Sequence, residues 1–287
     1  MTARDFFWDS KGTVRPPWRL AIFAASIVLS LILINSAVVP LVSWVLALSG
    51  VRVVLFPWAL LASVVVAHLL TFHWIEPRRW AAVKLDASAL RPRPILLGAA
   101  LGACAIGIPA LPLLAVGWLR VVPQPAGNWV VSAAAIALFL APAALWEEML
   151  FRGYAFTVLE EWWGTPGALG ATSLVFGLIH FQNAGATVAS ISVVVLAGVF
   201  LGGVLVATQS LYAAFAAHLA WNWMLAAVFH SAVSGIPFST PDYRVVDAGP
   251  DWATGGRWGP EGGLPAAIGL LLVTTYLYMR RRRREEL

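Results

Sequence analysis

The residues best equipped for acid–base chemistry lie within an apolar part of the sequence. Glu147, Glu148 and Arg152 stand within six residues of one another in a stretch that is otherwise uncharged from 121 to 159. A charge at the centre of a bilayer costs at least about 2.5–3.5 kcal/mol on insertion scales, so an ionisable residue in a membrane helix is a candidate for function. These side chains therefore form the first part of a predicted reaction site, and the alternative is a structural polar contact between helices.

Helical spacing assigns different tasks to the two glutamates. Glu148 and Arg152 are four residues apart, so they lie on one helix face and are expected to form an ion pair. Glu147 is rotated by about 100° from Glu148 and has no basic residue one turn away. Because an unpaired carboxylate in an apolar pocket is suited to act as a general base, Glu147 is the predicted base.

Three further polar side chains occur in later apolar stretches. His180 follows Phe176 by one helical turn, and His218 and Asn222 are also one turn apart, so that these two share a helix face. At about 1.5 Å per residue, Glu147, His180 and Asn222 each lie roughly 18–21 Å, and His218 roughly 12 Å, from a predicted turn on the same side of the membrane. We expect these polar groups to meet at one depth.

A carboxylate, two imidazoles and an amide at one depth are suited to hydrolysis of an amide bond by an activated water. In this interpretation a glutamate and one of the histidines hold and deprotonate the water. The second histidine and the asparagine side chain donate hydrogen bonds to the developing oxyanion, and one such donor contributes about 2.7–4 kcal/mol in other hydrolases. No serine or cysteine is paired with a base here, which disfavours a covalent mechanism.

A metal-bound water is the second interpretation of the same residues. Glu147, His180 and His218 could hold a zinc ion and leave one position open for water. The sequence has no His-Glu-x-x-His motif, and the three ligands would come from separate helices. No cofactor is certain, and a divalent metal such as zinc stays an alternative. The other histidines are expected to be structural: His68, His73 and His230.

The composition indicates the elements that must position these residues. Of 287 residues, 60% are hydrophobic and 11% are charged, against about a quarter charged in soluble domains. A bilayer core about 30 Å thick needs roughly 20 apolar residues per helix. We therefore predict an all-α, polytopic bundle of about eight transmembrane helices. The expected spans are 20–48, with a kink at Pro40, 53–75, 94–119, a fourth that begins at 121, three within 162–241 separated by turns at 183–185 and 208–210, and 262–279.

Basic residues indicate how the bundle is oriented. Fourteen of the 19 lysines and arginines fall in the N-terminal segment, in the loop 78–93 and in the C-terminal run 280–284. With eight spans all three lie on one side, so both termini are predicted to be cytoplasmic. The basic balance therefore reflects topology and membrane lipid rather than a nucleic-acid partner. The Ala- and Arg-rich composition suggests a bacterial inner membrane.

The chain is expected to form a single integral membrane domain, 1–287, with a catalytic core at 94–230. The segment 231–261, rich in Gly, Pro and Asp, is an outer loop longer than a plain connection needs, so it is either disordered or a partial lid. Cys104 is the sole cysteine, which excludes an intramolecular disulfide, and its apolar surroundings predict burial.

Three motifs in order resemble those of the CPBP intramembrane proteases, a family that includes the type II CAAX prenyl endopeptidases and bacteriocin-processing or Abi proteins. The motifs are Glu147-Glu148-x-x-x-Arg152, Phe176-x-x-x-His180 and His218-x-x-x-Asn222. The resemblance implies that Glu147 and His180 activate water, that His218 and Asn222 form the oxyanion site, and that Glu148 and Arg152 support them. It also implies a peptide or protein substrate, lipidated in the CAAX case.

Two other functions stay open. A catalytically silent immunity or regulatory protein could retain the same motifs. A proton-coupled transporter could use Glu147 and the histidines as a relay, but such a transporter is expected to show internal repeats or broken helix pairs, and the sequence has none that we detect.

Overall fold

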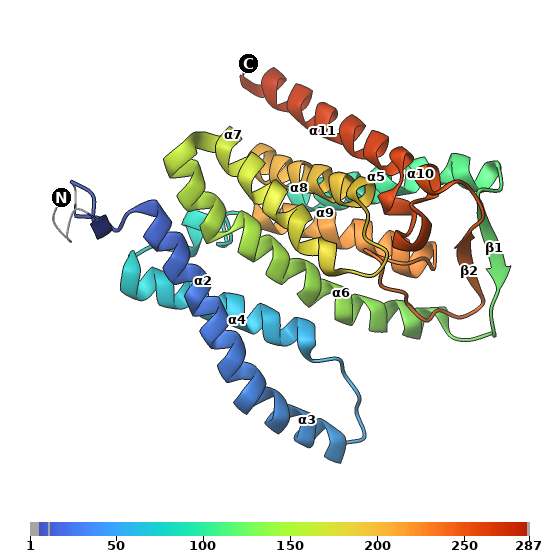
Figure 1. Cartoon of the computed structure of the whole chain (residues 1–287), viewed down its shortest axis with the longest axis horizontal. Helices are drawn as coiled ribbons and strands as arrows, with labels where there is room; N and C mark the ends of the chain where they lie inside the picture. Colours follow the sequence, from blue (N-terminus) through green and yellow to red (C-terminus); the bar gives the residue numbers. More distant parts are fainter. Residues whose placement is uncertain (1–5, 11, 286–287) are drawn as a thin grey trace.

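The computed structural model of the chain describes residues 6–10 and 12–285, and this part is predominantly helical (Figure 1). The predicted all-α fold class is therefore confirmed. The helices are α2 (Pro16–Leu33), α3 (Val39–Leu48), α4 (Phe56–Leu70), α5 (Pro92–Ala115), α6 (Trp129–Arg152), α7 (Tyr154–Ile179), α8 (Val188–Thr208), α9 (Leu211–Trp223), α10 (Asp251–Thr254) and α11 (Leu264–Glu285).

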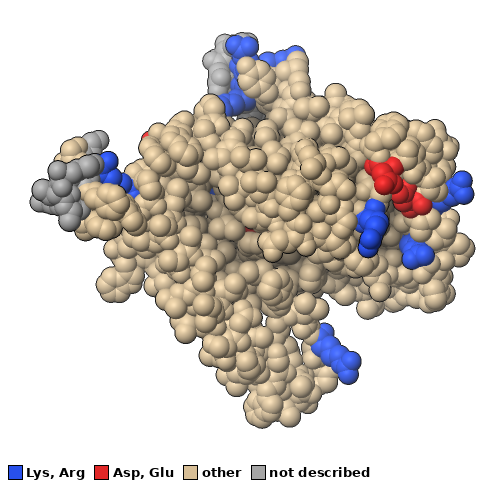
Figure 2. Space-filling view, viewed as in Figure 1, with Lys and Arg blue, Asp and Glu red and all other residues tan. Residues whose placement is uncertain are grey.

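Six helices in the described part are long and apolar enough to cross a membrane. Figure 2 shows the corresponding surface, on which uncharged side chains cover nearly the whole visible face and charged ones lie toward its margins. One of the six, Trp129–Gln182, reverses direction at Gly164, where the backbone takes φ 71° and ψ 172° (Figure 1). The integral membrane bundle is thus confirmed, while the count of eight spans and the cytoplasmic termini stay predictions.

The first span is kinked where the sequence places a proline. A π-helical turn, Ile34–Val38, joins α2 to α3 directly before Pro40. Proline has no N–H to donate and its ring collides with the carbonyl one turn back, so the helix widens locally to accommodate it. The predicted kink is therefore present. No residue of α3 is buried, and Figure 1 shows α3 pointing away from the bundle.

Close backbone packing fixes α9, the helix that carries His218. Gly98 and Gly102 of α5 face the carbonyl oxygens of Ala213 and Ala217 in α9, and an added Cβ at either glycine would overlap them. Small residues at such spacing let membrane helices approach closely.

Cys104, also on α5, is exposed rather than buried. Its apolar environment is expected to come from lipid instead of from the protein core.

Residues 121–128 differ from the prediction. They do not begin the fourth span, because β1 (Leu119–Pro123) pairs antiparallel with β2 (Tyr243–Asp247), with Val121 opposite Val245. Branched valines and two prolines, Pro123 and Pro125, disfavour a helix here. Helix α6 begins only at Trp129, after the Asn128 side chain accepts a hydrogen bond from Val131 N at 3.1 Å.

The outer loop is ordered. It contains β2, α10 and two 3-10 turns, Gly256–Trp258 and Pro260–Gly262, and the Trp258 side chain is fully buried. Of the two alternatives, disorder or a partial lid, disorder is not what the structure shows, and a lid stays a prediction.

The basic segments gather at one end of the bundle. Arg19 of α2 pairs with Glu76 at 2.7 Å and with Glu161 of α7 at 2.9 Å. Arg91 Nη2 donates to the Thr208 carbonyl at 2.9 Å, and the same arginine shares a groove with Arg280 and Arg281 of α11. These contacts place the basic segments at one end of the bundle, which is the arrangement that the predicted topology needs.

Candidate functional site

The predicted ion pair on α6 is present and completely buried. Arg152 Nη1 lies 3.2 Å from Glu148 Oε1, and neither side chain is exposed. Arg152 Nη2 also donates to the Gly198 carbonyl of α8 at 3.0 Å, and its guanidinium carbon lies 4.5 Å from the centre of the Phe176 ring on α7. One arginine therefore joins three helices and compensates the Glu148 charge.

His218 lies between the two glutamates. Its Nδ1 is 2.9 Å from Glu148 Oε1, and its Nε2 is 3.8 Å from Glu147 Oε2. Spacing along α6 predicts Arg152 as the partner of Glu148 and leaves Glu147 without a basic neighbour on its own helix. In the structure, both glutamates also contact His218 of α9. Glu148 contacts Arg152 and His218 together, and Glu147 faces the same imidazole.

His180 ends α7, at the 3-10 turn His180–Gln182. Its Nδ1 lies 2.7 Å from the Phe176 carbonyl oxygen, which can only accept, so Nδ1 donates. In a neutral imidazole this leaves Nε2 with a free lone pair. The Phe176 ring packs 4.9 Å from the His180 ring and 6.0 Å from the His218 ring, so both imidazoles contact the same aromatic side chain.

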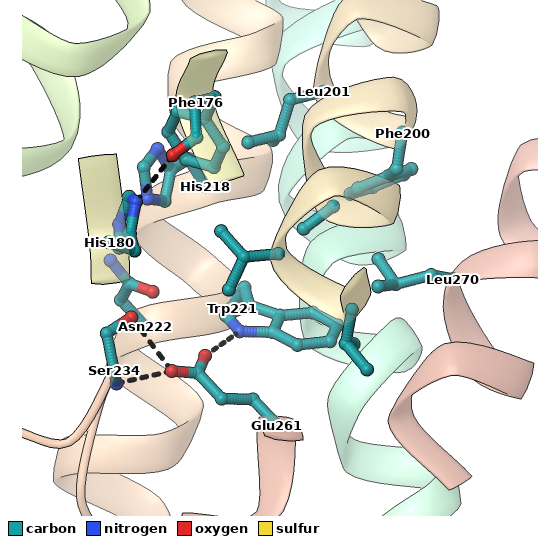
Figure 3. A pocket seen from close by; sticks show the side chains of 13 residues that line it. Phe176, His180, Phe200, Leu201, His218, Trp221, Asn222, Ser234, Glu261 and Leu270 are labelled. Atoms are coloured by element: carbon teal, nitrogen blue, oxygen red, sulfur yellow. Dashed lines mark hydrogen bonds between the residues drawn. The ribbon is translucent and has the colours of Figure 1, made fainter. Parts of the chain in front are cut away.

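A pocket inside the bundle brings three of the four predicted catalytic residues together. His180, His218 and Asn222 all line it (Figure 3). About 40 Å³ is open to the centres of water molecules, and one buried water needs about 10–15 Å³. Glu147 is not among the lining residues, and its contact with the group is the one with His218. The remaining walls are mostly apolar side chains: Phe176, Val193, Val194, Ala197, Phe200, Leu201 and Leu270.

The pocket also contains a carboxylate that sequence reasoning missed. Glu261 is 5% exposed, and its Oε2 accepts a hydrogen bond from Trp221 Nε1 at 2.6 Å. Its Oε1 accepts from Ser234 Oγ at 2.9 Å and from Ser234 N. Asn183, three residues after His180, donates to the Ser234 carbonyl at 3.0 Å. Glu261 therefore ties the outer loop to α9 and, through Ser234, to the turn beside His180 (Figure 3).

Only a weak signal could have identified Glu261. It is an acidic residue in a Gly- and Pro-rich segment, Gly259–Gly263, and such residues are usually solvated. Helical periodicity relates residues on one helix. It cannot predict that Glu261, in a loop, folds back onto Trp221 of α9, which lies 40 residues earlier in the sequence.

The three residues considered as zinc ligands are not gathered into one cluster. Within residues 6–10 and 12–285, no three His, Cys, Asp or Glu side chains are grouped so that they could hold a metal ion. Glu147 lies 3.8 Å from His218 Nε2, while His180 lies at the end of α7. A divalent metal held by Glu147, His180 and His218 stays an untested alternative.

The histidines expected to be structural have partners outside the pocket. His68 is buried, with Nδ1 2.8 Å from the Val64 carbonyl oxygen, and its Nε2 accepts from Tyr154 N at 3.3 Å. His230 stacks on the Tyr243 ring at 4.1 Å between ring centres. His73 packs edge-on against the ring of the neighbouring tryptophan. None of the three lines the pocket that holds His180 and His218.

Comparison with known proteins identifies the segment that carries this site. Residues 128–224, about a third of the chain, match the family model described as type II CAAX prenyl endopeptidase Rce1-like. The matched segment contains all three motifs. No curated protein and no solved structure matches the chain. The family that the motifs resemble is thereby confirmed for this segment.

Proposed function

Because residues 128–224 match the Rce1-like family model, we propose that this protein is an intramembrane endopeptidase that uses an activated water. The observation that carries the proposal is the pocket that His180, His218 and Asn222 line together. Glu147 Oε2 lies 3.8 Å from Nε2 of the His218 ring. The pocket is polar on one side and has room for water, as hydrolysis requires.

We assign the activation of water to Glu147 and His180. His180 holds the water through its free Nε2, because its Nδ1 is committed to the Phe176 carbonyl. The water oxygen bonds to the scissile carbonyl carbon while its proton passes to the Glu147 carboxylate. The electron pair of the C=O bond moves to the carbonyl oxygen. When that oxyanion collapses, the C–N bond breaks and the departing nitrogen takes the proton from Glu147.

His218 and Asn222 are assigned to the oxyanion. In its doubly protonated form His218 donates from Nδ1 to Glu148 and keeps an Nε2–H for the substrate oxygen. The Asn222 amide supplies a second donor from the next turn of α9. Each donor of this kind is worth about 2.7–4 kcal/mol in other hydrolases. Glu148 and Arg152 are positioning residues, since they hold His218 rather than touch the reacting atoms.

The substrate is proposed to be a peptide or membrane-anchored protein, with lipidated C-terminal peptides as one class to be tested. A membrane regulator that retained the motifs would have the same fold without turnover. Release of peptide fragments therefore separates the two functions.

The decisive experiment is a peptide-release assay with purified protein in proteoliposomes. Quenched fluorescent peptides are supplied in two sets, with and without a prenylated C-terminal cysteine. Wild type is compared with Glu147→Gln and with Glu160→Gln, a matched change at the bend of α7, where Glu160 contacts Thr165. We expect release by wild type and Glu160→Gln, and its loss in Glu147→Gln. The proposal would be contradicted if wild type released no fragment from either of the two peptide sets, or if Glu147→Gln released as much as wild type.

A further inference from the structure

A second groove, at the basic end of the bundle, is lined by four arginines. It lies where the loop before α5, the end of α8 and the last turns of α11 meet. Its basic lining residues are Arg91, Arg93, Arg280 and Arg281, and its other lining residues are Pro94, Leu97, Ala207, Thr208 and Leu277. We propose that this groove binds the phosphate headgroup of an anionic membrane phospholipid.

The positive charge of the groove favours an anionic ligand. Among the residues whose side chains the structure describes, four arginines line this one depression and no acidic side chain does. The planar fork of arginine matches phosphate oxygens better than a point charge does. Glu285 and Glu286 follow in the sequence, but the local balance stays positive because five arginines precede them.

One arginine of the groove is held in place by the protein itself. Arg91 Nη2 donates to the Thr208 carbonyl at 2.9 Å, at the C-terminal end of α8. Close by, Ser210 Oγ donates to the Ala89 carbonyl at 2.7 Å, which fixes the turn that leads into α9. Hydrogen bonds within the protein therefore hold the floor of the groove in place. About 200 Å³ of the groove is open to the centres of water molecules.

The position of the groove favours a lipid over a soluble anion. It lies where the apolar stretch of α5 begins, at Pro92, and where that of α11 ends, at Met279. Leu96 is 67% exposed and Met279 is 50% exposed, so apolar side chains stand on the open surface beside the arginines. Basic pockets between transmembrane helices with apolar flanks are typical sites for anionic headgroups. Figure 2 shows Lys and Arg side chains gathered at the C-terminal end of α11.

Native mass spectrometry of the detergent-purified full chain tests the site without any need for a peptide substrate. Phosphatidylglycerol and phosphatidylcholine with the same acyl chains are offered at equal concentration. The groove variant is Arg93→Gln/Arg280→Gln/Arg281→Gln. The matched control is Arg52→Gln/Arg120→Gln/Arg244→Gln, which removes the same charge from exposed sites outside the groove.

We expect wild type and the control to retain phosphatidylglycerol over phosphatidylcholine, and the groove variant to bind phosphatidylglycerol at least about tenfold more weakly. Equal binding by wild type and the groove variant would overturn the proposal. An equal loss in the control would do the same, because the effect would then reflect net charge alone. Displacement of the lipid by millimolar inorganic phosphate would reassign the groove to a soluble anion.

Discussion

His218 Nδ1 lies 2.9 Å from Glu148 Oε1, in the interior of the bundle. The same carboxylate oxygen is 3.2 Å from Arg152 Nη1. Glu148 therefore joins a cation on its own helix to an imidazole on α9, and its other oxygen, Oε2, has no hydrogen-bond partner in the described part of the chain. A single buried carboxylate thus determines how the His218 ring is oriented toward the pocket.

Arg152→Ala is expected to destabilise the protein strongly. The substitution leaves the Glu148 charge buried without its cation, and breaking a buried pair in this way typically costs about 3–5 kcal/mol. A thermal melt and the size-exclusion profile in detergent measure the loss. Arg120→Ala, on the exposed strand β1, is the matched control and should melt like wild type.

A double variant sharpens this test. Glu148→Gln combined with Arg152→Met removes both charges, so it should be more stable than Arg152→Met alone. Equal stability of the single and the double variant would mean that charge compensation is not what Arg152 contributes.

Sequence spacing predicted most of the site because the site is built on regular helices. The i,i+4 relation of Glu148 and Arg152 survives in α6, and the turns from which depth was counted are present. Gly164 and Gln209 take positive φ, 71° and 53°, where the chain reverses. Depth along a helix follows from sequence once the turns are identified.

Other contacts could not be predicted in this way. Depth does not specify rotation of α9 about its axis, so the contact of His218 with Glu148 was not foreseen. The pairing of Val121 with Val245 and the approach of Glu261 to Trp221 join segments far apart in the sequence. Such contacts depend on the folded shape of the outer loop, and helical periodicity carries no information about it.

Glu261→Ala is expected to loosen the outer loop. It leaves the Trp221 indole N–H and the Ser234 donors without their acceptor, and each buried unsatisfied group costs about 1–3 kcal/mol. Limited proteolysis of the segment 231–261 should become faster, while the helical bundle stays intact. Asp251→Ala, at an exposed position in the same loop, should be cleaved at the wild-type rate. Faster cleavage in both variants, or in neither, would show that Glu261 does not fasten the loop.

The basic end of the bundle is expected to face the cytoplasm. In a Cys104→Ser background, single cysteines are placed at Ser88, in the basic loop, and at Asp251, in the outer loop, both exposed positions. A membrane-impermeant maleimide should label Asp251→Cys in intact spheroplasts and Ser88→Cys only after permeabilisation. The reverse pattern would invert the topology predicted from the arginine distribution.

Glu147→Gln and Glu148→Gln should fail in different ways. The Glu147 side chain is 16% exposed and approaches His218 at 3.8 Å, so its amide variant is expected to fold and melt like wild type. Loss of a general base lowers the rate by about 10²–10⁴-fold. Glu148 is fully buried and compensates Arg152, so Glu148→Gln should lower the melting temperature and the yield of folded protein. The measurement is turnover per folded molecule, with folding judged by size exclusion and thermal melt. If Glu148→Gln is folded and inactive while Glu147→Gln still turns over, then Glu148 is the base and the assignment of the two neighbouring glutamates is reversed.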